Sequence, residues 1–200
     1  MSSPLKPAAL LLVLCCIAGF GPAAQAQGAP TVSQRDQVSL FGAATLLNTG
    51  LQSQQNIAVT GGIDIGLPST HSLEPSLEYR ATYPLATGSV DSQKSNLFGL
   101  RISFPYRLHP YADILIGRGE ITYYGRGQQV PGKLIYYTQS SSNIYAPGGG
   151  IDLDVADHVA LMADFQAERY STPVAASGHI YAMAATLGIA YRFHFKHINP

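Results

Sequence analysis

Two hundred residues are enough for one domain or two small ones. The 12 Lys and Arg residues balance 12 Asp and Glu residues, so the formal net charge is zero. This excludes a general nucleic-acid-binding protein, which needs a basic excess to hold phosphates. Charged residues make up 12% of the chain, against ~25% in an average soluble domain. The low charge indicates either an unusual surface or a chain that does not face water everywhere. The 20 glycines, 13 prolines and 10% aromatics are typical of a turn-rich β protein.

Residues 1–26 have the pattern of a cleaved secretory signal peptide. Lys6 supplies the positive charge, residues 8–20 are apolar, and Ala24-Gln25-Ala26 fits the small-x-small cleavage site. The apolar run is shorter than the ~20 residues of a membrane-spanning helix, and a retained anchor is the alternative. Both cysteines lie inside this run, at positions 15 and 16, so the mature chain offers no disulfide, thiolate nucleophile or Cys-ligated metal. A short polar segment, 27–37, follows.

From residue 38 onward, apolar residues recur with period two, which predicts strands. The clearest alternation is in 57–67, where Ile57, Val59, Ile63 and Ile65 share one face. Two segments are less regular: 38–48 alternates poorly, and 110–123 loses its phase around Gly117 and Gly119, which suggests a bulge. We predict eight strands, most of them longer than the usual five or six residues and long enough to cross a membrane when tilted: 38–48, 57–67, 73–83, 95–105, 110–123, 144–155, 158–170 and 180–195.

The connections between these strands alternate in predicted length. Short ones (67–73, 105–110 and 155–158) take turns with longer, Ser-, Gln- and Gly-rich ones (49–56, 84–94, 125–143 and 171–179). A meander whose two ends face different environments predicts this alternation. We expect 125–143 to form a long, mobile external loop.

Alternation by itself does not say which face is buried, and a soluble barrel would put the apolar rows inside. The polar rows are rich in Gly, Ala, Ser and Thr, which suit the crowded interior of an eight-stranded barrel. Aromatic residues gather near both strand ends, as membrane interfaces select. One set is Phe104, Tyr106, Tyr111, Tyr191, Phe193 and Phe195; the other is Tyr83, Tyr123, Tyr124, Tyr145, Tyr170 and Tyr181.

Together these features resemble the small OmpA-like outer-membrane β-barrels of bacteria, over residues 38–195. The resemblance implies an all-β fold, an eight-stranded antiparallel up-and-down transmembrane β-barrel, in the outer membrane. The last strand ends on an aromatic residue, Phe195, like the assembly signal of such barrels. The resemblance therefore implies outer-membrane lipids as partners, and the barrel assembly machinery as a partner of the last strand. The chain departs from the pattern in its tail, 196–200, and in having no peptidoglycan-binding domain after the barrel.

The predicted inward rows carry the most distinctive side chains of the chain. Charges in a narrow lumen must pair or stay hydrated, so we expect a salt-bridged network that plugs the barrel, with Glu78 nearly opposite Arg101. The alternative is a narrow path that favours cations, because acids outnumber arginines. The expected network is Asp64, Glu74, Glu78, Arg80, Arg101, Asp113, Asp152, Asp154, Asp164, Glu168 and Arg192.

Other motifs are weak. The run from Gly148 to Gly150 lacks the Lys-Ser/Thr of a phosphate loop and is better explained by packing. The six histidines show no metal-ligand spacing. His71-Ser72 and the pair Ser177 and His179 are nominal hydrolase candidates. We expect no catalytic, cofactor or metal residues, and a non-enzymatic surface or structural role. A cation-preferring channel, a lipid-modifying enzyme and a soluble ligand-binding barrel are the alternatives.

Overall fold

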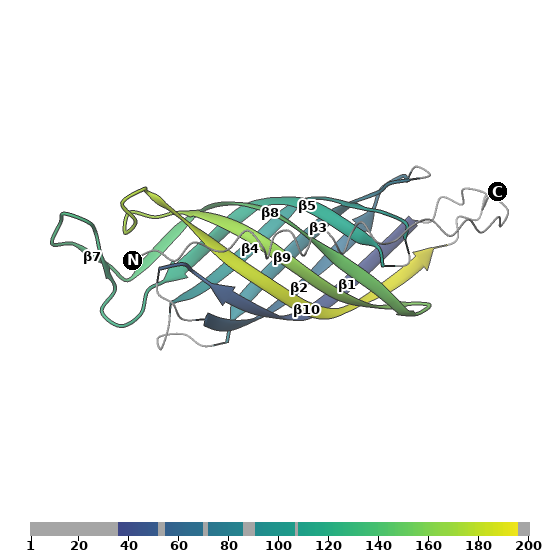
Figure 1. Cartoon of the computed structure of the whole chain (residues 1–200), viewed down its shortest axis with the longest axis horizontal. Helices are drawn as coiled ribbons and strands as arrows, with labels where there is room; N and C mark the ends of the chain where they lie inside the picture. The colour runs from purple at the N-terminus through teal and green to yellow at the C-terminus, as the bar shows by residue number, and fades with distance from the viewer. Residues whose placement is uncertain (1–35, 52–54, 70–71, 86–90, 107, 196–200) are drawn as a thin grey trace, which may run out of the picture. The chain divides into compact units, whose positions relative to one another are not determined.

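The computed structural model describes residues 36–51, 55–69, 72–85, 91–106 and 108–195. The predicted signal peptide and tail lie outside these ranges, as does most of the polar segment 27–37. Eight long strands and one small hairpin make up the described chain (Figure 1). No described helix is long and apolar enough to cross a bilayer. The strands are β1 (Asp36–Asn48), β2 (Gln55–Gly66), β3 (Glu74–Pro84), β4 (Ser92–Ser103), β5 (Pro110–Thr122), β6 (Gln128–Gln129), β7 (Tyr136–Tyr137), β8 (Gln139–Ala156), β9 (Val159–Ser171) and β10 (His179–Phe195).

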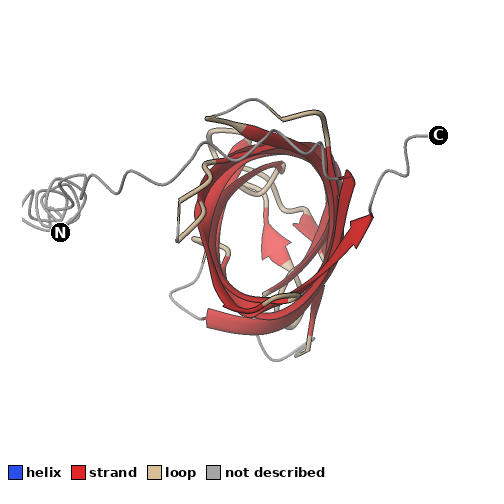
Figure 2. Ribbon diagram, turned by 90° about the vertical axis from the view of Figure 1, so that its right-hand side faces the viewer, coloured by secondary structure: helices blue, strands red, loops and turns tan. Residues whose placement is uncertain are grey.

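Every long strand pairs antiparallel with its neighbours along the chain, and β10 closes the sheet against β1. Figure 2 shows the resulting ring end-on. Following directly opposed residues once around the barrel leads from Tyr191 of β10 back to β10 at Tyr181, a stagger of ten residues. A stagger of this kind requires tilted strands. The predicted up-and-down barrel of eight strands is confirmed.

The apolar rows lie outside. Leu100, Leu161 and Ile189 are 43%, 44% and 55% exposed, although they belong to the middle of long strands. The opposite rows point inward and are buried, including charged residues such as Glu78 and Arg80. A water-soluble barrel would expose the charges and bury the leucines. The soluble alternative is therefore wrong, and the chain is a transmembrane barrel with a lipid-facing exterior.

The aromatic residues are divided differently from the prediction. Tyr83, Tyr124, Tyr145 and Tyr181 are exposed at one end, and four of the predicted set are exposed at the other: Phe104, Tyr106, Tyr191 and Phe193. Three predicted girdle residues are instead buried in the interior: Tyr111, Tyr123 and Tyr170. Each of the three hydroxyls is hydrogen-bonded inside the barrel, which explains why a Tyr is tolerated there.

The two ends of the barrel carry different connections. We call the "turn end" the one formed by 67–73, 104–109 and 157–158, where β1 begins and β10 ends. The opposite "hairpin end" holds 49–54, 85–91, 123–138 and 172–178. Only 123–138 is much longer than the rest, so the strict alternation of lengths is wrong. Some strands extend further than predicted and take up loop residues; β8, for example, begins at Gln139.

The long connection is not a plain loop. Its middle folds into the β6–β7 hairpin, with Gln128 paired to Tyr137 and Gln129 to Tyr136, and it projects beyond the barrel (Figure 1). The bulge predicted near Gly117 and Gly119 is also absent, because β5 pairs with both neighbours without a shift through that segment. The register shift lies in β8 instead, between Asp154 and Ala156.

Candidate functional site

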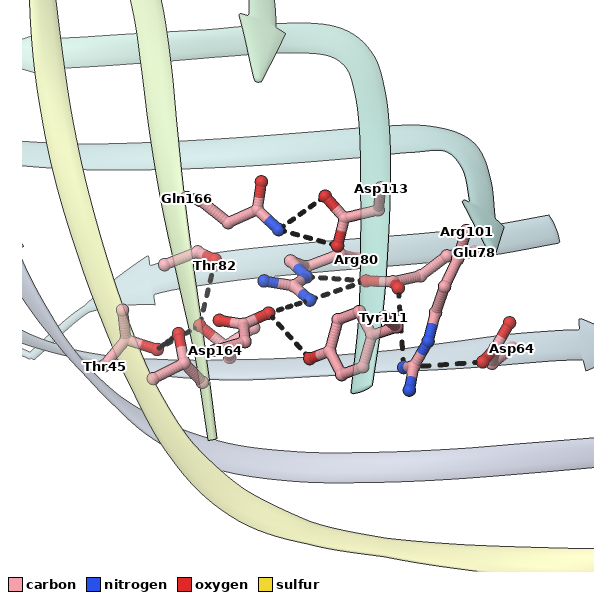
Figure 3. Close-up of polar contacts among 12 residues, drawn as sticks. Thr45, Asp64, Glu78, Arg80, Thr82, Arg101, Tyr111, Asp113, Asp164 and Gln166 are labelled. Carbon is pink, nitrogen blue, oxygen red and sulfur yellow. Dashed lines mark hydrogen bonds and ion pairs between the residues drawn. The ribbon is translucent and has the colours of Figure 1, made fainter. Parts of the chain in front are cut away.

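The charged residues inside the barrel form two linked clusters in its turn-end half. The first surrounds Arg80 of β3 (Figure 3). Its Nε donates a hydrogen bond to Glu78 at 2.8 Å, and its Nη2 lies 2.5 Å from the Asp164 carboxylate of β9. The guanidinium also stands over the Phe41 ring, 5.5 Å from its centroid. All three charged side chains are at most 2% exposed, so the pairing is shielded from water.

The second cluster surrounds Arg101 of β4. Its Nη2 is 2.5 Å from Asp152 of β8, and its Nη1 lies 3.6 Å from Asp64 and 3.8 Å from Glu78. The guanidinium stacks on Tyr111, 3.5 Å from the ring centroid. Because Glu78 contacts both Arg80 and Arg101, the two clusters form one network.

Arg192 of β10 extends this network toward the turn end. It pairs with Asp152 at 3.1 Å and with Asp154. The Asp154 side chain is 42% exposed, so the network meets water at this point. This network of ion pairs, here called the ionic layer, thus runs from the buried centre of the barrel to its turn-end mouth.

Two buried acids of the expected network have no arginine or lysine of the described chain within ion-pair distance. Asp113 accepts two hydrogen bonds from the Gln166 amide, at 2.8 and 2.9 Å. Glu168 accepts one from the Tyr170 hydroxyl at 2.6 Å and one from Ser95 at 3.3 Å. Neutral donors therefore satisfy the acids that the arginines do not reach.

Glycines in β8 make room for these contacts. A Cβ on Gly148 would lie 2.2 Å from the side-chain amide of Gln166, and one on Gly150 would lie 2.7 Å from the Tyr111 hydroxyl. The run from Gly148 to Gly150 is part of a strand and not a loop. Packing, rather than phosphate binding, accounts for it.

A ladder of threonine hydroxyls crosses the inner wall beside the ionic layer. Thr45 of β1 is 3.1 Å from Thr186 of β10 and 2.6 Å from Thr60 of β2, which is 3.0 Å from Thr82 of β3. The sequence analysis missed this ladder. The sequence does carry a signal for it, because a Thr recurs at an inward position in each of these four strands, which are neighbours in the closed barrel.

The hairpin-end half of the lumen holds an apolar cluster, here called the apolar layer, which the sequence analysis also missed. Buried polar side chains such as Asn56 and Gln93 lie at the same end. The cluster comes from β4, β5, β8, β9 and β10 and from the connections after β5 and β9. The buried members are Leu97, Leu115, Ile121, Tyr123, Ile144, Ala146, Tyr170, Val174, Ile180 and Ala182. The lumen therefore contains the ionic layer in its turn-end half and the apolar layer toward the hairpin end.

The expected polar network is brought together in large part. Nine of its eleven residues contact one another or a neighbouring polar side chain inside the barrel: Asp64, Glu78, Arg80, Arg101, Asp113, Asp152, Asp164, Glu168 and Arg192. Asp154 joins only at the mouth, and Glu74 is exposed at the start of β3. Both lie where the strands leave the barrel.

The expected register between β3 and β4 is wrong by two residues. Gly99, and not Arg101, lies opposite Glu78, while Arg101 lies opposite Ser76. The long Arg101 side chain still reaches Glu78 diagonally, at 3.8 Å. The length of a connection does not fix its turn geometry, so the sequence could not decide between these registers.

The nominal hydrolase pair does not form a nucleophile and base. The Ser177 hydroxyl donates to the backbone carbonyl of His179 at 2.8 Å, and the His179 ring lies 2.9 Å from the carbonyl of Ser177. Each side chain is thus bound to backbone and not to the other side chain. His71 of the second pair lies outside the described residues. No group of three or more His, Cys, Asp or Glu in the described chain could hold a metal ion.

The closed barrel and its lipid-facing exterior define the class: a small transmembrane β-barrel of the outer-membrane type. No protein-family model and no curated protein sequence matches the chain. Among solved structures, it is similar to Neisserial surface protein A (14% identity, TM-score 0.50, covering 80% of this chain and 96% of that one). It also matches the N-terminal β-barrel domain of Pseudomonas aeruginosa OprF (14% identity, TM-score 0.47, covering 80% and 99%). The first likeness confirms the resemblance at the level of the fold.

Proposed function

We propose that this protein is a non-enzymatic outer-membrane barrel. Its strands would brace the membrane, and its hairpin-end connections would contact the cell exterior. The observation that supports this proposal is that an ionic layer and an apolar layer of buried side chains both lie in the lumen.

Each layer opposes conduction for a different reason. An eight-stranded barrel is only just wide enough for its interior side chains, and the arginines tie facing walls together: Arg80 joins β3 to β9, and Arg101 joins β4 to β8. In the other layer, residues such as Leu97, Leu115 and Ile144 offer no oxygen that could replace the hydration shell of an ion. Both sets of side chains therefore oppose the passage of an ion.

Planar-bilayer recording of the purified protein tests the closed lumen. We expect no single-channel steps from protein whose folded state has been verified by heat-modifiable gel mobility. Six inward acids face three arginines, which favours a cation path as the second candidate. A steady cation-selective current from folded protein would replace the closed-lumen proposal with that one.

Location and partners are tested separately. Fractionation of cells should recover the protein with the outer membrane, where lipids surround it and the barrel assembly machinery would have recognised its last strand. Deletion of the strand's terminal Phe195 should reduce the recovered amount. Recovery in the periplasmic fraction would refute the placement. A lipid-modifying activity that is lost on Ser177→Ala would refute the non-enzymatic role.

A further inference from the structure

Among the described residues of the strands, the outward-facing cationic side chains lie near the hairpin end. Lys94, Arg118 and Arg169 point outward from β4, β5 and β9, near the hairpin end, and all are exposed. Each stands where an apolar outward row stops: Ile114 and Ile116 precede Arg118, and Phe165 precedes Arg169. These cations therefore mark the edge of the lipid-facing band at the hairpin end.

Two of these cations are close neighbours on the wall. Arg118 lies directly opposite Asn143 of β8, and Arg169 lies directly opposite Tyr145 of the same strand. The two guanidiniums thus flank one strand, with an amide and an exposed phenol between them. Tyr181 lies on the far side of Arg169. The result is a polar patch, Arg118–Asn143–Tyr145–Arg169, above an apolar wall.

The charges of this patch are not offset. Lys94 forms an ion pair with Glu120 at 2.9 Å, whereas neither Arg118 nor Arg169 has an ion pair with a described residue. Among the described residues of the turn end, the exposed charged side chains include the acids Glu74, Asp154 and Asp157. The patch thus presents two free cations to one leaflet of the membrane.

We propose that Arg118 and Arg169 bind the phosphate group of an anionic lipid in the leaflet at the hairpin end. Guanidinium groups match phosphate oxygens with two parallel hydrogen bonds, and Asn143 and Tyr145 add neutral donors between them. The acyl chains of such a lipid would lie on Ile116 and Phe165 directly below. Free phosphate has no acyl chains and would make no such apolar contacts. The inference rests on the membrane placement proposed above.

The test uses the folded barrel in phosphatidylcholine vesicles that contain a small fraction of bis-phosphorylated lipid A, with lipid retention measured by native mass spectrometry. The variant R118Q/R169Q removes both patch cations, and R126Q/K133Q removes two exposed cations of the connection 123–138 as a matched control. We expect R118Q/R169Q to retain lipid A about 25-fold less well, at roughly fivefold for each cation at a membrane surface. The control should retain it like the wild type.

Three results would overturn the inference. They are unchanged retention by R118Q/R169Q, an equal loss in R126Q/K133Q, and equal retention of lipid A from which the phosphates have been removed. Displacement of lipid A by millimolar inorganic phosphate would indicate a site for free phosphate instead. Normal gel mobility of R118Q/R169Q in pure phosphatidylcholine would show that the variant folds. Failure of the outer-membrane placement would be seen separately, in cell fractionation.

Discussion

Replacing Arg80 by Met tests whether the ionic layer holds the barrel together. The substitution keeps an apolar side chain of similar length but removes three contacts, at 2.5, 2.7 and 2.8 Å. It leaves the buried carboxylates of Glu78 and Asp164 without their closest cation. Breaking a buried ion pair from one side costs about 3–5 kcal/mol, so Arg80→Met should lower the free energy of unfolding by that amount.

After Arg80→Met, the carboxylates of Glu78 and Asp164 keep different contacts. Glu78 keeps Arg101 at 3.8 Å, but Asp164 keeps only a hydrogen bond from Tyr111 at 3.3 Å. Adding Asp164→Asn to Arg80→Met should therefore recover more stability than adding Glu78→Gln. This order follows from the geometry and not from the number of charges, since both double variants remove one acid and one base.

Unfolding by urea in neutral detergent micelles measures these differences. The chain has 12 tyrosines and no tryptophan, so tyrosine fluorescence and heat-modifiable gel mobility are suitable signals. Arg118→Met serves as the control, because Arg118 is exposed on the outer wall, and it should change stability by no more than about 0.5 kcal/mol. The reasoning is refuted if Arg80→Met behaves like this control, or if Asp164→Asn recovers nothing.

Three further predictions concern other parts of the barrel. Leu100→Arg or Ile189→Arg should destabilise the barrel in vesicles by about 2–4 kcal/mol, because each puts a charge on the lipid face; unchanged folding yields would contradict the outward assignment. Gly150→Ala should cost about 1–3 kcal/mol in urea unfolding, since its Cβ would lie 2.3 Å from the Ala163 carbonyl oxygen, whereas Gly42→Ala, with open space around it, should be nearly neutral. Trypsin added to intact cells should cut first within 123–138, which projects from the hairpin end; initial cleavage at the turn end would invert the topology.

The sequence was sufficient for the strand faces because period-two alternation reports directly on which side of a sheet a residue lies. It was sufficient for most inward charges for the same reason. It could not separate the roles of the tyrosines, because Tyr111 in the lumen and Tyr145 on the wall belong to the same residue type near a strand end. Only the parity of each position within its strand distinguishes them, and that requires the exact strand phase.

Register and lumen layering were harder to predict. The register of β3 and β4 depends on the geometry of the connection between them, for which period two carries no information. The apolar layer combines residues from five strands, among them Leu97, Ile144 and Ile180, that meet only after closure. Inward apolar residues are inconspicuous one strand at a time, so the layer is not visible before the stagger of the barrel is known.

The placement of the ion pairs also bears on how the barrel assembles. Arg80 and its partner Asp164 are 84 residues apart in sequence, and Arg101 and Asp152 are 51 apart. A sheet that contains only β1 to β5 therefore holds both arginines without these carboxylates, while β8 to β10 alone hold more acids than bases. Neither half satisfies these side chains until the other is present. Such non-local pairing slows folding, and it makes partly inserted sheets unstable as intermediates. The barrel should enter the membrane as one cooperative unit, with closure of β10 on β1 as the step that completes its electrostatics.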